Sequence, residues 1–437
     1  MKDLIKTILY EWMNKPLPDT IARDIDLQKY AEARPSKITA ITGFRRVGKT
    51  YLLYDLIKRL LQKNMREEML YVNFEDERIP LQTGFMTALL PMFKQLFDKK
   101  MKYLFLDEIQ NMPEWSKWVR RIYDKEALRI FITGSSSKMS SKEIPTELRG
   151  RFLSVDVFPL SFSEFLRFSN MTVNAEAIKY SEEERAKLSK AIAEFLTYGS
   201  MPEVVLANKN FKFEIINSYY QSVVRRDIIE RHNVRNEESL KALLRLLMNS
   251  TSYSISKVYN TLKSLGYKVG KSTVQSYLSH IENAYFMFSL PLFSYKIKNQ
   301  MQYARKLYVI DNGFINKIST KLSNNYGRLF ENAVALHLVR TSNGKELYYW
   351  KSTKEEVDFV VKQGTKVKQL IQVCYDATDV STRERETRAL IKASKELGCR
   401  DLLIITNEYE STVEEKWFGT TRTIEFIPLW KWFLAKF

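Results

Sequence analysis

The segment that most constrains this chain is a glycine-containing loop between an apolar strand and a helix. Its sequence, GFRRVGKT at residues 43–50, fits the pattern G-x-x-x-x-G-K-[ST] and follows the apolar run KITAIT at residues 37–42. Residues 50–63 continue with leucine and isoleucine on one side of a helix. Glycine allows backbone N–H groups to approach a phosphate closely, and the start of the helix points its positive end at the same group. The sequence therefore predicts a phosphate-binding loop that holds a nucleotide.

Two consecutive carboxylates follow another apolar strand. The segment YLFLDE at residues 103–108 ends in Asp107 and Glu108. With Thr50, Asp107 is expected to hold Mg²⁺, directly or through water, while Glu108 orients and deprotonates the attacking water. Lys49 is expected to reach the β- and γ-phosphates of ATP. The residues predicted to bind ATP and Mg²⁺ are Gly43, Phe44, Arg45, Arg46, Val47, Gly48, Lys49, Thr50 and Asp107.

Three further side chains are candidates for catalysis. Ser135 follows the strand RIFIT (residues 129–133) and is placed to sense the γ-phosphate or the attacking water; a serine-rich turn is the alternative. Arg149 and Arg151 lie in ELRGRF (residues 147–152). Either arginine is suited to stabilise transition-state charge, in the same chain or from a neighbouring subunit, and an ordinary surface arginine is the alternative for each.

The fold class follows from the alternation of strands and helices. Short apolar strands are expected at residues 37–42, 69–74, 103–106 and 129–133, with helices between them. Nearly continuous apolar strands that alternate with helices are typical of a parallel sheet covered by helices on both faces. We therefore predict an α/β core in the first part of the chain.

Composition limits the class of protein. The chain has 437 residues, two cysteines and three histidines, which predicts several domains, no disulfide framework and no zinc cluster. Its longest nearly apolar run, residues 284–293, is too short to span a membrane, so we expect a soluble, cytoplasmic protein without a membrane partner. The formal net charge is +18. Residues 205–310 hold sixteen Lys and Arg against six Asp and Glu, a net +10, which favours polyanions such as DNA; a solvated basic face is the alternative.

The order of the motifs GFRRVGKT, YLFLDEIQ, RIFITGSSS, ELRGRF and VFPLSFSEF resembles a family of bacterial and archaeal AAA-type (AAA+) ATPases. In that family a C-terminal domain of unknown function, related to restriction nucleases, follows the ATPase module. The resemblance implies an AAA+ core, a winged-helix middle domain and a nuclease-like end. The expected segments are an N-terminal helical lead-in (1–35), the ATPase core (36–160), a helical lid or linker (161–236), the winged-helix domain (237–320) and the restriction-endonuclease-like α/β domain (321–437).

The middle segment contains a candidate recognition helix. Residues 272–275 (STVQ) fit a capping box that opens a helix after a glycine-bearing turn, as in a helix-turn-helix. Lys268, Arg305 and Lys306 are further candidates for phosphate contacts from flanking loops or a wing. A winged helix used for protein contacts is the alternative. The predicted DNA-binding residues are Lys271, Ser272, Thr273, Gln275, Lys296 and Lys298.

The nuclease-like end departs from the pattern of active restriction-type nucleases. These enzymes need a helix Glu, a strand Asp and a Glu-x-Lys on the next strand, so that carboxylates hold Mg²⁺ and the lysine supports the water or the transition state. Glu331 and Asp358 match the first two positions, but Gln372 and Cys374 occupy the last two. We therefore expect a degenerate site without cleavage, unless Asp376 or Lys351 compensates.

These features predict an Mg²⁺-dependent ATPase whose nucleotide state is coupled to DNA binding through a winged helix. One alternative is an ATP-gated, metal-dependent DNA nuclease. The other is a nucleotide-dependent scaffold for protein partners without DNA. The oligomeric state stays open, since an arginine supplied from a neighbour requires contact between subunits.

Overall fold

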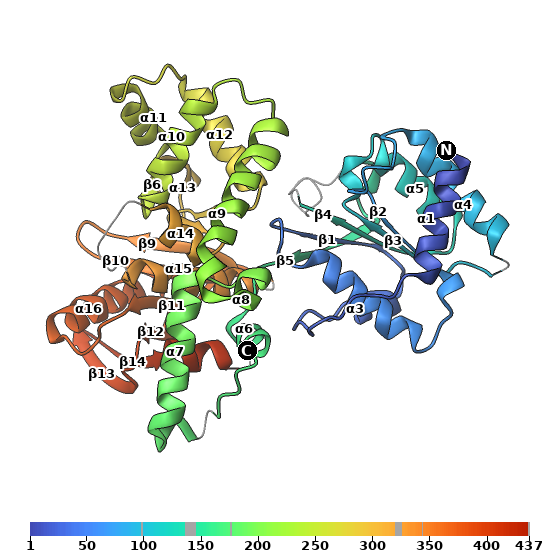
Figure 1. Cartoon of the computed structure of the whole chain (residues 1–437). Coiled ribbons are helices and arrows are strands. Elements are labelled where there is room, and N and C mark those ends of the chain that lie inside the picture. Colours follow the sequence, from blue (N-terminus) through green and yellow to red (C-terminus); the bar gives the residue numbers. More distant parts are fainter. Residues whose placement is uncertain (98, 136–145, 175–176, 320–325, 343, 436–437) are drawn as a thin grey trace. The chain divides into compact units, whose positions relative to one another are not determined.

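The computed structural model describes residues 1–97, 99–135, 146–174, 177–319, 326–342 and 344–435. The chain divides into two compact units (Figure 1). Unit 1 comprises Met1–Phe158 with Asn283–Tyr285, and unit 2 comprises Pro159–Glu282 with Phe286–Phe437. No helix in the described part of the chain combines the length and the apolar composition needed to cross a membrane.

Unit 1 is built on a five-stranded sheet in the order β2-β3-β4-β1-β5, in which every neighbouring pair is parallel. This confirms the predicted parallel α/β core. The central strands are buried along almost their whole length because helices cover the sheet on both sides. The strands are β1 (Ile38–Gly43), β2 (Met69–Asn73), β3 (Tyr103–Asp107), β4 (Arg129–Gly134) and β5 (Phe152–Val157).

The strand order decides which helix covers which face. The connection from β1 to β2 runs toward one edge of the sheet, whereas those from β2 to β3 and from β3 to β4 run back. Because parallel crossovers are right-handed, α3 lies on one face, and α4 and α5 lie on the other (Figure 1). The helices of this unit are α1 (Lys2–Asn14), α2 (Gln28–Glu32), α3 (Lys49–Leu61), α4 (Thr83–Leu96) and α5 (Trp115–Lys125).

The N-terminal helix α1 is part of the packed core of unit 1. Ile5, Ile8, Leu9 and Trp12 recur at helical spacing and are buried. Their helix packs against α4 and β2, and the Trp12 indole N–H donates to the carbonyl of Met69 at 2.8 Å. The segment expected as a lead-in therefore covers the β2 side of the sheet.

Strand β5 was not predicted from the sequence. It pairs only with β1, at the edge of the sheet, and its buried residues alternate with exposed ones. An edge strand of this kind lacks the continuous apolar run that identified the central strands. Its position matters because its last residue, Val157, lies beside Gly43 in the β1–β5 register.

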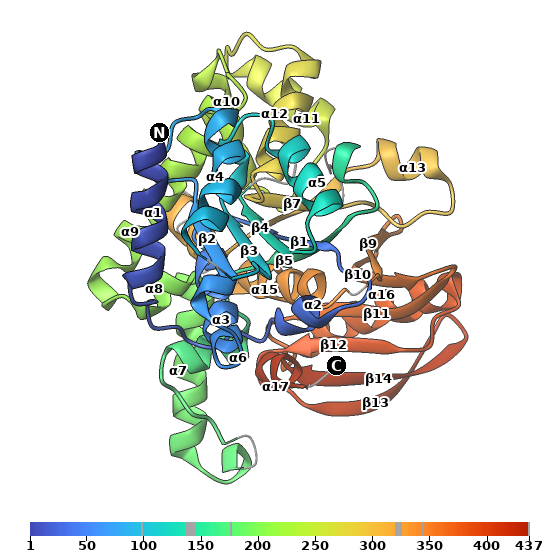
Figure 2. The ribbon, with the colours of Figure 1, turned by 90° about the vertical axis from the view of Figure 1, so that its right-hand side faces the viewer.

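Unit 2 begins with helices and then forms a small antiparallel sheet in the order β6-β8-β7. Figures 1 and 2 show α10, α11 and α12 clustered at one end of this unit, above β6 and β7. The helices before the sheet are α6 (Phe162–Phe168), α7 (Glu182–Tyr198), α8 (Pro202–Leu206), α9 (Lys212–Ser222), a π-helix (Val223–Glu230) and α10 (Glu237–Met248). The elements that follow are β6 (Ser252–Tyr253), α11 (Ile255–Ser264), α12 (Lys271–Asn283), β7 (Met287–Leu290), α13 (Ile297–Gln302) and β8 (Arg305–Val309).

The start of α12 differs from the predicted capping box. The helix begins at Lys271, so Ser272 lies within its first turn, and the Ser272 carbonyl accepts a hydrogen bond from the Ser276 hydroxyl at 3.1 Å. The prediction that Ser272 caps the helix is therefore wrong, because the residue directly before the helix is Gly270, two positions earlier. Gly270 precedes the helix, and its carbonyl accepts a helical hydrogen bond from the Val274 N–H at 3.1 Å.

The rest of unit 2 contains a six-stranded mixed sheet in the order β13-β14-β12-β11-β10-β9. Helix α16 packs on this sheet and supplies Leu390 and Ile391 to its apolar core, while α15 packs against β11 and β8. The strands are β9 (Glu346–Lys351), β10 (Glu356–Gln363), β11 (Lys366–Cys374), β12 (Leu402–Thr406), β13 (Ser411–Trp417) and β14 (Thr420–Pro428). The helices are α14 (Asn312–Ile318), α15 (Tyr326–Arg340), α16 (Val380–Leu397) and α17 (Leu429–Leu434).

Candidate functional site

The loop between β1 and α3 has a backbone that requires glycine at its start. Gly43 has a φ of +148°, and a Cβ atom added there would lie 2.1 Å from the carbonyl oxygen of Val157 on β5. Gly48, directly before α3, has a φ of 94° and is the N-cap of that helix. Arg46 also has a positive φ, of 67°, a backbone conformation that is uncommon for residues other than glycine. The loop is thus held in a tight curve between the sheet and the helix N-terminus.

The Lys49 side chain folds back against the backbone carbonyls of this loop. Its side chain is buried, and its Nζ lies 3.2 Å from the carbonyl oxygens of Gly43 and Phe44. The same ammonium lies 3.5 Å from Oε1 of Glu108. A buried ammonium that rests on carbonyls and one carboxylate can exchange these partners for phosphate oxygens at little cost in desolvation.

Asp107 lies at the end of β3 and is fully buried. Its Oδ2 accepts hydrogen bonds from the Thr50 hydroxyl at 2.8 Å and the Tyr71 hydroxyl at 2.9 Å, and its Oδ1 accepts one from the Thr133 hydroxyl. Burial raises the pKa of Asp107, although these donors oppose the shift. The Thr50 hydroxyl and the Asp107 carboxylate together form an oxygen donor set that fits Mg²⁺.

Glu108 differs electrostatically from its neighbour. Burial acts to raise the pKa of Glu108, but the Lys49 ammonium and the Gln110 amide outweigh it, so the pKa is lowered. Asp107 faces only uncharged donors, which is why the two adjacent carboxyls shift in opposite directions. Glu108 also has a φ of 51°, and its N–H donates to the Thr133 hydroxyl at 2.8 Å. An anionic carboxylate held in this way can accept a proton from water.

Two residues of this site were missed in the sequence. Thr133 ends the apolar part of β4, and the β3–β4 register, which pairs Leu106 with Ile132, places its hydroxyl between the two carboxyl residues. Tyr71 lies on β2, and its own hydroxyl accepts a hydrogen bond from the Tyr54 hydroxyl at 3.1 Å. Both contacts arise from the order of strands in the sheet, which spacing along the chain does not reveal.

The other three catalytic candidates, Ser135, Arg149 and Arg151, differ in burial and in their contacts. Ser135 directly follows β4 and is buried, whereas the serines after it, at 136 and 137, lie outside the described residues. Arg151 forms an ion pair with Asp124 on α5, in which the Arg151 Nε lies 2.9 Å from Oδ1 of Asp124. Arg149 is exposed and, among the residues that the structure describes, has no ion-pair partner. The catalytic roles of all three remain predictions.

Comparisons with known proteins identify the family to which this chain belongs. A family model described as an AAA domain matches residues 35–166. An uncharacterized protein of Methanocaldococcus jannaschii is 41% identical over 427 residues, which cover 95% of this chain and 91% of the relative. The chain belongs to the AAA-type P-loop ATPase family. An uncharacterized protein of Haemophilus influenzae is 28% identical over 402 residues, covering 90% of this chain and 95% of that protein.

The comparisons for the second unit give no activity. Two models described as domains of unknown function, DUF8612 and DUF4143, match residues 189–325 and 326–432 of this AAA-type ATPase.

Among solved structures compared with the whole chain, a Walker-type ATPase of Pyrococcus abyssi is 15% identical. The match covers 69% of this chain and 99% of that protein, with a TM-score of 0.47.

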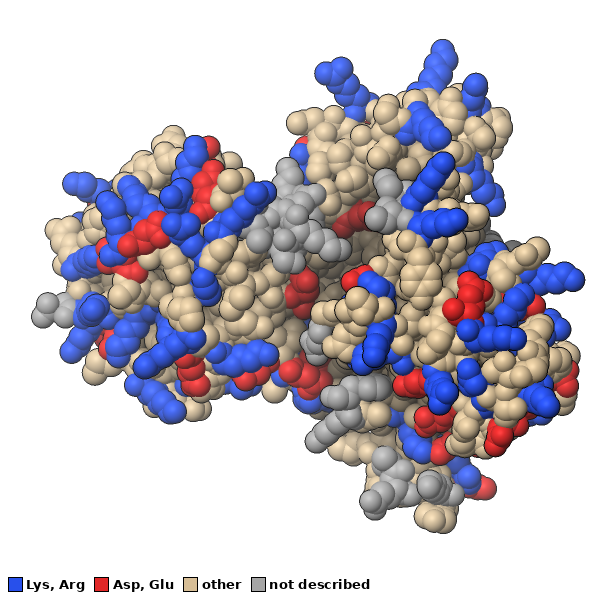
Figure 3. Space-filling view, turned by 180° about the vertical axis from the view of Figure 1, so that it is seen from behind, with Lys and Arg blue, Asp and Glu red and all other residues tan. Residues whose placement is uncertain are grey.

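The predicted DNA-binding residues lie mostly on the surface of this AAA-type protein. Lys271, Ser272 and Gln275 are exposed on the first turns of α12, and Thr273 is half-buried. The two lysines at the start of α13, Lys296 and Lys298, are also exposed. Figure 3 shows Lys and Arg side chains protruding from the end of unit 2 that contains α10, α11 and α12. The surface is accessible to a polyanion, and its DNA binding remains a prediction.

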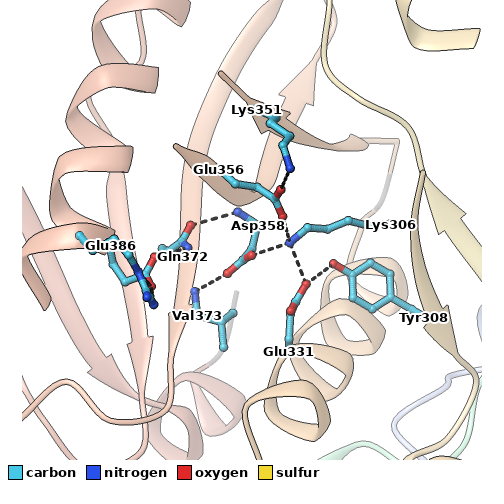
Figure 4. Close-up of polar contacts among 10 residues, drawn as sticks. Lys306, Tyr308, Glu331, Lys351, Glu356, Asp358, Gln372, Val373 and Glu386 are labelled. Carbon is cyan, nitrogen blue, oxygen red and sulfur yellow. Dashed lines mark hydrogen bonds and ion pairs between the residues drawn. The ribbon is translucent and has the colours of Figure 1, made fainter. Parts of the chain in front are cut away.

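The predicted nuclease-like residues are only partly brought together (Figure 4). Glu331 on α15 and Asp358 on β10 contact the same ammonium group, and the side-chain Oε1 of Gln372 accepts the backbone N–H of Asp358 at 3.0 Å. Cys374 lies apart: its thiol donates to the Asp376 carbonyl at 3.4 Å, and burial raises its pKa to about 12. It is therefore a neutral thiol in the apolar core under α16.

The ammonium group in this cluster belongs to Lys306, which was expected to contact DNA phosphates. The structure shows that this expectation is wrong. Lys306 on β8 is buried and forms ion pairs with Glu331, Glu356 and Asp358. A lysine enclosed by three carboxylates is not available to a phosphate. The residues around Lys306 in the sequence do not indicate that it is buried. An exposed lysine on an edge strand could have the same neighbours along the chain.

Proposed function

We propose that this chain binds ATP with Mg²⁺ and hydrolyses it. The observation that carries the proposal is the convergence of Lys49, Asp107 and Glu108 at the carboxyl ends of β1 and β3, directly before the N-terminus of α3. The strand order reverses beside β1, and such a switch point is where ligands bind in open α/β sheets. Thr50 and Asp107 would hold Mg²⁺, which withdraws charge from the β- and γ-phosphates when bound.

The protein groups have distinct parts in this reaction. Lys49 exchanges the carbonyls of its loop for phosphate oxygens, and this releases Glu108 from its ion pair. Glu108 then accepts a hydrogen bond from the attacking water and takes its proton. The Thr133 hydroxyl keeps the two carboxyl residues in register. Among the described residues, Arg151 has an acidic partner in Asp124 whereas Arg149 has none, so Arg149 is the better candidate to reach a neighbouring subunit.

Phosphate release from ATP tests this proposal. Glu108→Gln should still bind ATP, because the loss of its charge leaves Lys49 freer for phosphate, but its turnover should fall by about 10²-fold or more. Glu77→Gln is a matched control, since Glu77 is exposed in the loop after β2. Hydrolysis by Glu108→Gln at the wild-type rate would contradict the assigned role.

We further propose that the region from α10 to β8 is a winged helix that binds DNA in a nucleotide-dependent way. The proposal rests on the order of three helices and an antiparallel sheet, and on the exposed basic residues at the start of α12 and α13. Binding by phosphate contacts releases counterions, so affinity should fall steeply with salt. The same helix used for a protein partner would give no such dependence.

A DNA-binding assay at several salt concentrations separates these outcomes. Lys271→Ala and Lys298→Ala should each weaken binding and reduce the salt slope by about one. Lys368→Ala is the control, because Lys368 is exposed on β11 of the six-stranded sheet. Absence of DNA binding would leave a protein-interaction scaffold, and an ATPase rate that DNA does not change would refute the coupling.

For the final part of unit 2 we propose a restriction-nuclease-like fold that does not cleave. The support is the placement of Glu331 on a helix and Asp358 on an adjoining strand, together with the replacement of the last two functional positions by Gln372 and Cys374.

A further inference from the structure

Lys306 lies at the centre of three carboxylates in unit 2. Its Nζ is 2.5 Å from Oδ1 of Asp358, 3.0 Å from Oε1 of Glu331 and 3.1 Å from Oε1 of Glu356. Figure 4 shows the three acidic side chains converging on this one ammonium from two elements, α15 and β10. The three donors of a lysine ammonium are thereby matched to three acceptors.

The cluster connects two sheets of the same unit. Lys306 belongs to β8 in the three-stranded sheet, Glu331 to α15, and Glu356 and Asp358 to β10 in the six-stranded sheet. Tyr308, two residues further along β8, donates its hydroxyl to Oε1 of Glu331 at 2.7 Å. Because alternate residues of a strand share a face, β8 presents both groups to the cluster.

The second oxygen of the Asp358 carboxylate and the side chain of Gln372 also have partners. The second oxygen of Asp358 accepts the N–H of Val373 at 2.9 Å. Gln372, which stands where a third metal ligand would be, donates its amide to Glu386 on α16 at 2.5 Å. The second Asp358 oxygen and the Gln372 amide are thus held by protein partners rather than left open toward a metal ion.

Charge favours a cation at this place, and the chain itself supplies it. The three carboxylates face Lys306, and Lys351 adds a second ammonium at the exposed side, 2.9 Å from Oε2 of Glu356. Burial acts to lower the pKa of Lys306, but the carboxylates outweigh it and hold the pKa well above the ordinary value. The ammonium therefore stays charged at neutral pH.

The distances exclude a second cation beside this one. Mg²⁺ requires oxygens at about 2.0–2.1 Å in near-octahedral geometry, whereas Oδ1 of Asp358 and Oε1 of Glu331 already accept hydrogen bonds from Nζ of Lys306. Within the described ranges, no group of three or more His, Cys, Asp and Glu side chains is arranged to hold a metal ion. The metal that a nuclease-like fold implies does not fit these residues while Lys306 is in place.

We propose that the Lys306 ammonium is a built-in cation that occupies the carboxylate cluster in place of a divalent metal ion and joins β8 to α15 and β10. The site is then a structural clamp closed to Mg²⁺ and Mn²⁺. The competing idea is that Lys306 serves as the missing nuclease lysine beside a bound metal. That idea requires a metal held by Asp358 in the wild-type protein, so the two are separable by experiment.

Equilibrium binding of Mn²⁺, followed by the electron paramagnetic resonance of the free ion, provides the test. All proteins are full-length, nucleotide-free and carry Asp107→Asn, which removes the metal carboxylate of the ATPase site. Without further change, the protein should show no Mn²⁺ site that depends on Asp358. Lys306→Met should bind one Mn²⁺ at least about a hundredfold more tightly, because it removes a positive charge from the centre of three carboxylates.

Two further variants assign that gain to the cluster. Lys351→Met makes the same substitution at the exposed ammonium that pairs with Glu356, and it should leave Mn²⁺ binding unchanged. Adding Asp358→Asn to Lys306→Met should abolish the new site. A folded Lys306→Met protein that binds no Mn²⁺ would overturn the proposal.

The proposal stays testable if Lys306→Met does not fold, which is a real outcome when buried carboxylates lose their partner. Wild type and Asp358→Asn then decide it. An Mn²⁺-dependent rise in the melting temperature of wild type that Asp358→Asn removes would overturn the proposal, and its absence supports it. Cleavage of DNA by wild type with Mg²⁺ or Mn²⁺, lost in Asp358→Ala, would likewise establish the nuclease reading.

Discussion

Replacing Thr133 by valine removes one buried hydroxyl that joins both carboxyl residues of the nucleotide site. The hydroxyl donates to Oδ1 of Asp107 and accepts the N–H of Glu108 at 2.8 Å. Thr133, Asp107 and Glu108 are all buried, so water does not replace either contact. Valine has nearly the same shape, and the substitution therefore tests the two hydrogen bonds without opening a cavity.

The two losses can be estimated separately. A hydrogen bond to a charged group contributes about 1.5–3 kcal/mol, and a buried N–H left without an acceptor costs about 1–3 kcal/mol. We therefore expect Thr133→Val to lower the free energy of unfolding of unit 1 by about 2.5–6 kcal/mol. Without the Thr133 donor the pKa of Asp107 should rise further, because that donor opposes the effect of burial. Weaker support of the metal carboxylate should lower Mg²⁺-dependent ATPase activity by about 10- to 100-fold.

Hydrogen exchange of the β3 and β4 amides in the full chain measures the stability of unit 1 separately from unit 2. Thr87→Val is the matched control, since the Thr87 hydroxyl is exposed on α4 and donates to the Thr83 carbonyl of the same helix at 3.0 Å. The control should change protection by less than about 0.5 kcal/mol. If Thr133→Val changed protection as little as the control does and left the ATPase rate intact, the bridging role would be refuted.

Two other predictions follow from single positions. Gly43→Ala places a Cβ 2.1 Å from the Val157 carbonyl oxygen and should abolish ATP binding, measured by equilibrium dialysis, whereas Gly150→Ala, also at a positive φ but with open space around it, should retain it. Burial lowers the pKa of His337 from 6.5 to about 3, so the unfolded chain takes up a proton first and unit 2 should lose up to about 5 kcal/mol of stability as the pH falls from 6.5 toward 3. His337→Phe should flatten this part of the urea-unfolding profile against pH, and an unchanged slope would contradict it.

The parts of the nucleotide site that are contiguous in the sequence could be predicted from it. The loop at Gly43–Thr50 has a fixed spacing, and β1, β3 and β4 are continuous apolar runs because both faces of the sheet are covered. Their parallel pairing then brings their carboxyl ends to one edge. Strand β5 escaped prediction because an edge strand buries only alternate residues.

The contacts that were missed join residues distant in the chain. Tyr71 and Thr133 reach Asp107 only through the strand order β2-β3-β4, which no motif specifies. Lys306 lies 52 positions from Asp358, and its burial depends on the packing of β8 against α15 and β10. A charge that is buried by tertiary packing cannot be distinguished in sequence from a charge on the surface.

The central claim is that the loop before α3 and the carboxylate of Asp107 hold a nucleoside triphosphate with its metal. Isothermal titration of the purified chain with ATP, with Mg²⁺ and with excess EDTA, tests it most directly, using Lys49→Ala as the variant. We predict Mg²⁺-dependent binding by the wild type that Lys49→Ala abolishes or greatly weakens. Wild-type protein that shows no Mg²⁺-dependent affinity for any nucleoside triphosphate would contradict the account.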